Sequence, residues 1–248
     1  MVRRDRSLLV FPVVAGVCCI VVAALFFGAG AGLAVAADAW WPAVPFVIAG
    51  AYLLIVIGQF CAVALASCAT AALDGRDTTV GEGVAAARGR LGVILQWSAV
   101  QLVVGAAISA LQALLREAGG NLVGAIFGGL ADVAWAVATF FVVPVIALEG
   151  LGPKDAIKRS AGVVRERWGE GVVGTAAIGL VAFLIALPGM ALVVLGVMAM
   201  SGSAVGGGLL IAVGVVLIIA ASLFQATISS VFRVALYRFA TQDEVTGG

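Results

Sequence analysis

Six long stretches that are almost free of charge constrain the fold of this chain more than any other feature. They are Leu8–Ala37, Pro42–Leu73, Leu91–Leu115, Leu122–Leu148, Val172–Met200 and Val205–Phe239. Each exceeds the roughly 20 apolar residues that a helix needs to cross a bilayer. Only 11% of the 248 residues are charged and the mean hydropathy is +1.21, whereas a soluble domain needs a far more charged surface. We therefore predict an all-α, polytopic membrane helical bundle with six transmembrane helices.

The positions of the basic residues predict how this bundle is oriented. Thirteen of the fourteen Lys and Arg residues lie in the N-terminal segment, in the second and fourth connections between the stretches, or near the C-terminal end. Arg116, in the third connection, is the exception. By the positive-inside rule, the basic connections and both termini are expected to be cytoplasmic.

A shift of the sequence by 77 residues brings the two basic connections into register. Four apolar residues spaced i, i+4, i+7 and i+11, which form one stripe on a helix, then align with four others: Val80, Val84, Ala87 and Leu91 with Ile157, Ala161, Val164 and Trp168. A capping box at Thr79 and Glu82 is expected to begin the first helix, and Pro153 the second.

The same pattern recurs in part at the N-terminus, where "RDR" precedes Ser7 as "RGR" precedes Leu91. We therefore predict three repeat units, approximately 1–75, 76–150 and 151–240, within one membrane domain, 1–248. Each unit is a basic amphipathic interfacial helix followed by a transmembrane hairpin. Because the first unit is short, we expect the native start to lie upstream of Met1.

The connection from Glu149 to Gly171 is the longest charged segment. Its apolar stripe is expected to lie on the inner membrane surface, with basic side chains near lipid phosphates. The candidate residues for a lipid headgroup or a docking partner are Lys154, Lys158, Arg159, Arg165, Arg167, Arg88 and Arg90. The alternative interpretation is that these charges only fix the topology.

Polar residues inside the apolar stretches form a second candidate site. Asp132, Gln59 and Gln225 are expected at a similar depth, roughly 20 to 25 Å from the inner end of their helices. Gln225 and Ser229 share a helical face with Ser222 and Arg233, and Arg233 is expected to extend towards the inner surface. This layer either joins helices by hydrogen bonds or binds a ligand or a proton.

The sequence offers little for catalysis. It has no histidine, no Walker lysine motif and no carboxylate cluster at membrane depth, so we predict that the protein is not an enzyme and has no cofactor. The four cysteines fall in the first two stretches and are expected to pack as small apolar side chains; the alternative is a soft-metal site. The basic segments are interleaved with acids, which argues against nucleic-acid binding.

The segment from Ala138 to Glu170 resembles a family of uncharacterised bacterial integral membrane proteins. The matching residues are Thr139, Phe140, Phe141, Pro144, Glu149, Gly150, Gly152, Pro153, Lys158, Arg159, Ser160, Trp168, Gly169 and Glu170. The opening "RRDRSLLVFP" and the closing "FRVALYRFA" are also similar to the ends of that family. A looser similarity links the chain to the membrane domain of some glycerophosphodiester phosphodiesterases. The resemblance implies a bacterial inner-membrane protein and no particular activity.

Two functional hypotheses follow from the sequence. The first is a non-enzymatic scaffold of the inner membrane that binds anionic lipids, or a membrane or cytoplasmic protein partner including a second copy of itself. The second is a transporter or carrier of a small or lipidic molecule that uses the polar midplane residues.

Overall fold

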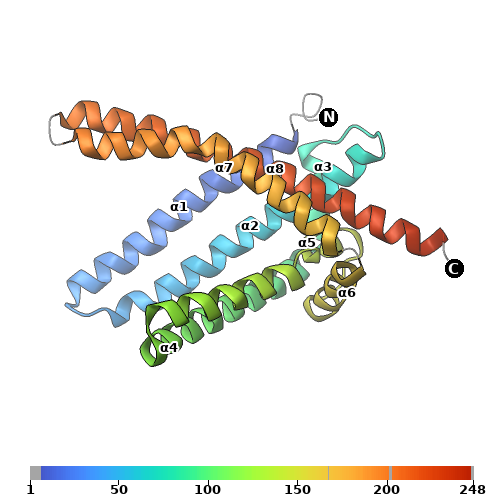
Figure 1. Cartoon of the computed structure of the whole chain (residues 1–248), viewed down its shortest axis with the longest axis horizontal. Helices are drawn as coiled ribbons and strands as arrows, with labels where there is room; N and C mark the ends of the chain where they lie inside the picture. Colours follow the sequence, from blue (N-terminus) through green and yellow to red (C-terminus); the bar gives the residue numbers. More distant parts are fainter. Residues whose placement is uncertain (1–6, 167, 201–202, 247–248) are drawn as a thin grey trace.

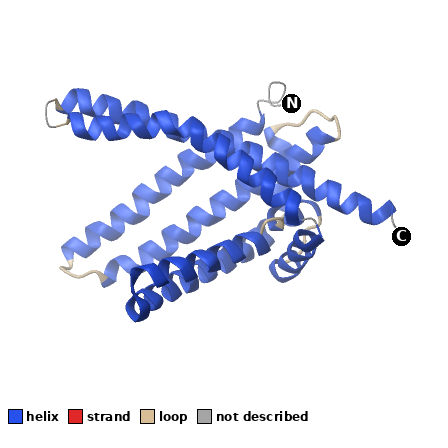
Figure 2. Ribbon diagram, viewed as in Figure 1, coloured by secondary structure: helices blue, strands red, loops and turns tan. Residues whose placement is uncertain are grey.

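The computed structural model of the chain describes residues 7–166, 168–200 and 203–246, and every regular element in this part is a helix (Figure 2). The helices are α1 (Ser7–Ala36), the short 3-10 helix η1 (Trp41–Ala43), α2 (Val44–Leu73), α3 (Val80–Gly89), α4 (Leu91–Ala138), α5 (Val142–Leu148), α6 (Pro153–Glu166), α7 (Trp168–Ala199) and α8 (Ala204–Thr246). Five helical segments of the described chain are long and apolar enough to cross a membrane. Only a small share of the residues in each of these apolar segments is buried within the protein. This is expected of helices whose outer faces contact lipid.

The long helices form hairpins that extend from one shared end of the molecule (Figure 1). Helix α1 packs along α2, and α7 packs along α8. The short helices α3, α5 and α6 all lie at the shared end, where α3 packs on α2, and α6 packs on α4 and α5. We call this end, made of α3, α5, α6 and the adjoining ends of α2, α4 and α8, the base.

Helix α4 reverses direction at Gly120, whose φ of 80° is non-helical. Glycine adopts this conformation without a steric cost because it has no Cβ. The two arms then run antiparallel, and Gln112 Nε2 donates a hydrogen bond to Asp132 Oδ2 across them at 3.0 Å. The arms therefore correspond to the stretches Leu91–Leu115 and Leu122–Leu148, which the sequence predicts as two separate helices.

The second of these stretches is not one continuous helix, which corrects the sequence prediction. The helix ends at Ala138, turns through Thr139–Phe141 and restarts as the seven-residue α5. Pro144 gives the physical reason: it has no N–H to donate, and in a continuous helix its ring would collide with the carbonyl group four residues earlier. The freed N–H of Phe141 donates to Ser160 Oγ at 3.0 Å instead.

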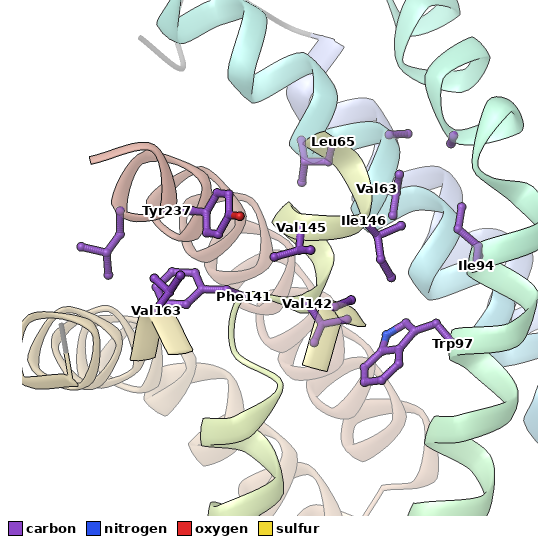
Figure 3. Packing of buried hydrophobic residues seen from close by; sticks show 14 of the residues in the cluster. Val63, Leu65, Ile94, Trp97, Phe141, Val142, Val145, Ile146, Val163 and Tyr237 are labelled. Atoms are coloured by element: carbon purple, nitrogen blue, oxygen red, sulfur yellow. The ribbon is translucent and has the colours of Figure 1, made fainter. Parts of the chain in front are cut away.

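The main hydrophobic core of the described residues lies in the base (Figure 3). Phe141, Val142, Val145 and Ile146 supply its centre and are almost fully buried. They pack between α2, α4 and α8, and Trp97 of α4 stacks on Trp135 of the other arm with ring centroids 5.9 Å apart. Because the helix breaks before α5, the last seven residues of the predicted stretch form the centre of the base.

The two helices predicted to lie on the membrane surface each pack one face on the protein, α3 on α2 and α6 on α4 and α5. The capping box that begins α3 is confirmed, with Glu82 N donating to Thr79 Oγ1 at 3.3 Å, and α6 begins at Pro153 as predicted. The packing face of α6 overlaps the predicted stripe only in part: Val164 is buried and Ile157 packs against the core, but Ala161 is exposed and the buried face also includes Ala156, Ser160 and Val163. The side chain of Trp168 lies outside the described residues. Ser160 must face inwards to accept the hydrogen bond from Phe141, and this requirement sets the rotation of the helix.

Candidate functional site

The polar residues predicted to form one layer are divided among separate contacts. Gln59 Nε2 donates to Gln101 Oε1 at 2.9 Å and thereby joins α2 to α4. Asp132 is exposed and accepts from Gln112 of the other α4 arm. Each of these pairs connects helices, as in the hydrogen-bonding interpretation. The other two predicted residues, Gln225 and Ser229, lie elsewhere.

Gln225 and Ser229 line an open groove between α8, α2 and α5. The groove has a volume of about 330 Å³, which lies at the lower end of the range for small-ligand sites. Its lining residues are Ala62 of α2, Val143 and Pro144 of α5, and Ser222, Gln225, Ala226, Ser229, Ser230 and Arg233 of α8. The α8 face that the sequence predicted to be polar is therefore one wall of this groove. We call it the α8 groove.

Arg233 is the charged residue of the α8 groove, and its environment differs from the prediction. Its guanidinium lies over the ring of Phe140, 5.0 Å from the centroid, instead of extending to the surface. Its buried Nε has no hydrogen-bond partner in the described part of the chain. Among the described residues, no acidic side chain lines the groove. The cation–π contact compensates part of the cost of burying this charge and leaves N–H groups free to bind an acceptor.

A smaller and more apolar cavity adjoins the α8 groove. It has a volume of about 150 Å³ and is bounded by α1, α2 and α8. Ala62, Ala226 and Ser230 line both spaces. The remaining lining of the second cavity is apolar apart from the thiol of Cys61, and includes Phe11 and Leu65. A polar space and an apolar space therefore share one wall.

Some of the predicted basic residues hold the base together. Arg159 Nε lies 3.5 Å from Glu149 Oε1, and Tyr237 of α8 donates its hydroxyl hydrogen to the same carboxylate. The side chain of Arg90 lies against Gly150, whose φ is 67°. Glu149 and Gly150 thus connect α4, α6 and α8 around the end of α5. Both residues belong to the segment that resembles the membrane-protein family, and no other sequence pattern indicated this structural role.

A further ion pair fastens α2 to α8 in the base. Arg238 Nη1 lies 2.6 Å from Asp74 Oδ1, and Arg76 Nη2 lies 3.3 Å from Oδ2. The hydrogen bond from Arg238 lowers the pKa of Asp74 below its ordinary value of 3.8, with a smaller contribution from Arg76 and against partial desolvation. The contact therefore stabilises the folded protein when the carboxylate is ionised.

The stability that Asp74 contributes should depend on pH. Because its folded pKa is depressed, the contribution is complete above the ordinary value of 3.8 and is lost as the pH falls through the lower folded value. Asp74→Asn should therefore lower Tm at neutral pH, and this difference should shrink below about pH 4. Thermal unfolding of the detergent-solubilised protein across this range measures it. Asp77→Asn is the matched control, because exposed Asp77 has no ion pair within the described chain; a difference that persisted in acid would contradict the assignment.

The other predicted basic residues are exposed at the surface of the base. Lys154, Lys158 and Arg165 lie on α6, and Arg88 lies on α3. Arg167 lies outside the described residues. The three α6 side chains share one face, opposite the buried Ala156, Ser160 and Val163. This exposed set, which we call the basic face, is the part of the predicted surface site that remains available to bind something else.

The four cysteines differ in burial. Cys68 is buried in the main core, Cys19 and Cys61 are half-buried, and Cys18 is exposed. All four are free thiols. Within the described residues, no group of three or more His, Cys, Asp and Glu side chains is placed to hold a metal ion.

Comparison with known proteins yields one match. A family model described as a family of unknown function (DUF6159) matches residues 43–248, which is most of the chain. No curated protein and no solved structure matches the chain. The matched region begins at η1 and includes the base, the α8 groove and the basic face.

Proposed function

We propose that this chain, which belongs to the DUF6159 family of unknown function, is a six-span protein of the inner (plasma) membrane that works by binding rather than by catalysis. The spans are α1, α2, the two arms of α4, α7 and α8. The base and both termini lie on the cytoplasmic side. This arrangement is supported by the lengths of the apolar helices and by the thirteen-to-one distribution of basic residues.

The function that we propose for the base is to hold anionic lipid at the inner membrane surface. The carrying observation is the basic face, in which Lys154, Lys158 and Arg165 are exposed on a helix whose opposite side is packed into the core. Arg159 and Arg90 are engaged within the base, so the exposed residues are the ones free to meet phosphates. The rigid packing of α6 keeps them together on one face.

Physical reasons favour anionic lipid over a protein partner as the first ligand. The ends of α2 and α8, joined by Asp74 and Arg238, mark the cytoplasmic ends of two spans. Lys and Arg side chains near this level meet lipid headgroups, and each contributes about 1 kcal/mol of attraction to an anionic surface. Asp155 is exposed on the same helix and weakens this attraction, so the expected preference is moderate and sensitive to salt.

Neutralising the basic face should therefore reduce the selectivity for anionic lipid. We expect Lys154→Gln, Lys158→Gln and Arg165→Gln together to lower the preference for spin-labelled phosphatidylglycerol over phosphatidylcholine several-fold in proteoliposomes at low salt. High salt should remove most of the wild-type preference and leave the triple variant little changed. Electron spin resonance of the motionally restricted lipid measures both quantities.

Arg116→Gln is the control for this experiment. It removes one basic residue on the opposite side of the proposed membrane and retains the Cγ that packs near Gly124. It should leave the selectivity at the inner surface unchanged. If the triple variant kept the full salt-sensitive preference, lipid binding by the basic face would be contradicted, and a soluble partner captured only by the wild-type face would become the better explanation.

The second candidate function, a carrier, has one observation in its favour, which is the α8 groove. A carrier also needs a polar route that can be exposed alternately to the two sides. Asp132 and Gln59 are engaged with Gln112 and Gln101 and do not line the groove. The support is therefore for a binding site on one side of α8 and not for a continuous path.

A further inference from the structure

The α8 groove and its apolar neighbour together have the chemistry of a site for one anionic lipid molecule. We propose that the phosphate of such a lipid binds at Arg233, and that one of its acyl chains lies along the apolar cavity between α1, α2 and α8. The site is separate from the basic face and shares no residue with it. It therefore does not depend on lipid binding by the basic face, and it rests on the proposed function only for the placement of the base at the inner membrane surface.

Arg233 supplies the reason for an anion. Its guanidinium remains charged in proteins, and a charged side chain at membrane depth is costly unless it is paired. Phe140 covers one face of the group, but the buried Nε–H has no acceptor among the described residues and no carboxylate lines the groove. A phosphate would supply oxygen acceptors and the opposite charge together, in the geometry that a guanidinium favours.

The depth of Arg233 fits a headgroup at the inner leaflet. It lies five residues before Arg238 on α8, which is about 7 Å along a helix axis, and Arg238 is paired with Asp74 at the end of α2. Ser229 and Gln225 follow one and two turns further into the span and line the same groove. A hydroxyl and an amide in these positions can donate hydrogen bonds to phosphate, glycerol or ester oxygens.

The neighbouring cavity supplies the reason for a lipid rather than a free phosphate. It shares Ala62, Ala226 and Ser230 with the α8 groove, so a molecule that occupies both must be polar at one end and apolar at the other. The α8 groove is open where Ser222 and Gln225 are exposed. An amphiphile can therefore enter from the bilayer, whereas a soluble anion would have no use for the apolar space.

Ligand-dependent thermal stability of the full chain in detergent tests this proposal. Dihexanoyl phosphatidylglycerol should raise Tm in a saturable manner, and Arg233→Gln should increase the lipid concentration at half-saturation by at least about tenfold, because a hydrogen bond to a charged group is removed. Arg233→Lys should retain part of the lipid-dependent rise in Tm, since lysine keeps the positive charge but loses the bidentate geometry of the guanidinium. Inorganic phosphate and glycerol phosphate are tested in parallel as soluble compounds that carry the same phosphate group without acyl chains.

A second variant keeps the test valid if Arg233→Gln fails to fold. Ala226→Leu adds bulk to the wall that the two spaces share and leaves Arg233 intact, so it should weaken the response to the lipid in the same direction. Ala220→Leu, at an exposed α8 position that lines neither space, is its control and should respond as wild type does. The triple variant of the basic face should also retain the wild-type response.

Three results would overturn the proposal. The first is an unchanged half-saturation concentration in Arg233→Gln or, if that variant does not fold, in Ala226→Leu. The second is an equal response of the wild-type protein to dihexanoyl phosphatidylcholine, which lacks the net charge. The third is an equal response to inorganic phosphate or glycerol phosphate at the same concentration, which would leave a soluble anion as the occupant and exclude the lipid.

Discussion

Gly150→Ala should strongly destabilise the protein, whereas Gly152→Ala, two residues along the same connection, should change its stability little. Gly150 has a φ of 67°, a conformation that costs a residue with a Cβ about 1–2 kcal/mol. A Cβ at this position would also overlap the guanidinium of Arg90, which lies at the end of a flexible side chain and can move aside, so the backbone conformation carries most of the cost. The loss should lower Tm by about 2–8 °C, at about 2–4 °C per kcal/mol for a chain of this size.

The position of Gly150 explains why the effect should extend beyond one loop. The neighbouring carboxylate of Glu149 accepts from Tyr237 and pairs with Arg159, so displacing the backbone here disturbs contacts of α4, α6 and α8 together. Thermal unfolding in detergent measures the loss. Gly152 is the matched control because no atom lies within 4 Å of a Cβ added there. Equal Tm values for the two variants would contradict the role assigned to Gly150.

Gly214→Val should separate α7 from α8 and lower the stability of that hairpin. A Cβ on Gly214 would lie 2.6 Å from the carbonyl oxygen of Gly189 and 2.9 Å from the amide nitrogen of Val193. The contact is reciprocal, since a Cβ on Gly189 would lie 2.8 Å from the carbonyl oxygen of Gly214. Small residues allow helix backbones to approach closely within a membrane. The atoms that would have to move are backbone atoms, so the helices themselves must shift.

We expect a loss of about 1–3 kcal/mol for Gly214→Val from this overpacking. The measurement is thermal unfolding, together with cross-linking of cysteine pairs introduced across α7 and α8, which should decrease as the helices separate. Gly208→Val makes the same substitution on the same helix at a position where no atom lies within 4 Å of the added Cβ. It should leave both readouts nearly unchanged. Cross-linking at the wild-type level in Gly214→Val would show that the close approach is not required.

The hairpins could be predicted from the sequence because the physics that produces them is local. An apolar stretch in a bilayer must satisfy its backbone hydrogen bonds internally, so length and hydropathy are sufficient to predict a helix. Local chemistry also predicted the capping box of Thr79 and Glu82 and the start of α6 at Pro153, and both are confirmed. The threefold repeat and the orientation in the membrane remain predictions.

The contacts of the intramembrane polar residues were harder to predict from the sequence. The depth of a residue along a helix does not specify which neighbour its side chain meets. Asp132, Gln59 and Gln225 were assigned a similar depth, yet the first two bind Gln112 and Gln101 while Gln225 lines the α8 groove. Gln112 and Gln101 were not among the predicted site residues. Their roles depend on how the α4 arms pack on each other and on α2.

The sequence by itself determined that the chain forms long apolar helices linked by charged connections, because bilayer length and backbone satisfaction depend only on consecutive residues. The tertiary structure decided what those connections do. The helix breaks between Ala138 and Val142, and the N–H of Phe141 in this break donates to Ser160 Oγ, nineteen residues away. That long-range bond directs the Ser160 face of α6 towards the core and leaves Lys154 and Lys158 exposed. It also holds α6 against α5, which lies at the centre of the base and lines the α8 groove with Val143 and Pro144. Hydrogen bonds between distant residues depend on packing, and a local pattern does not contain that information.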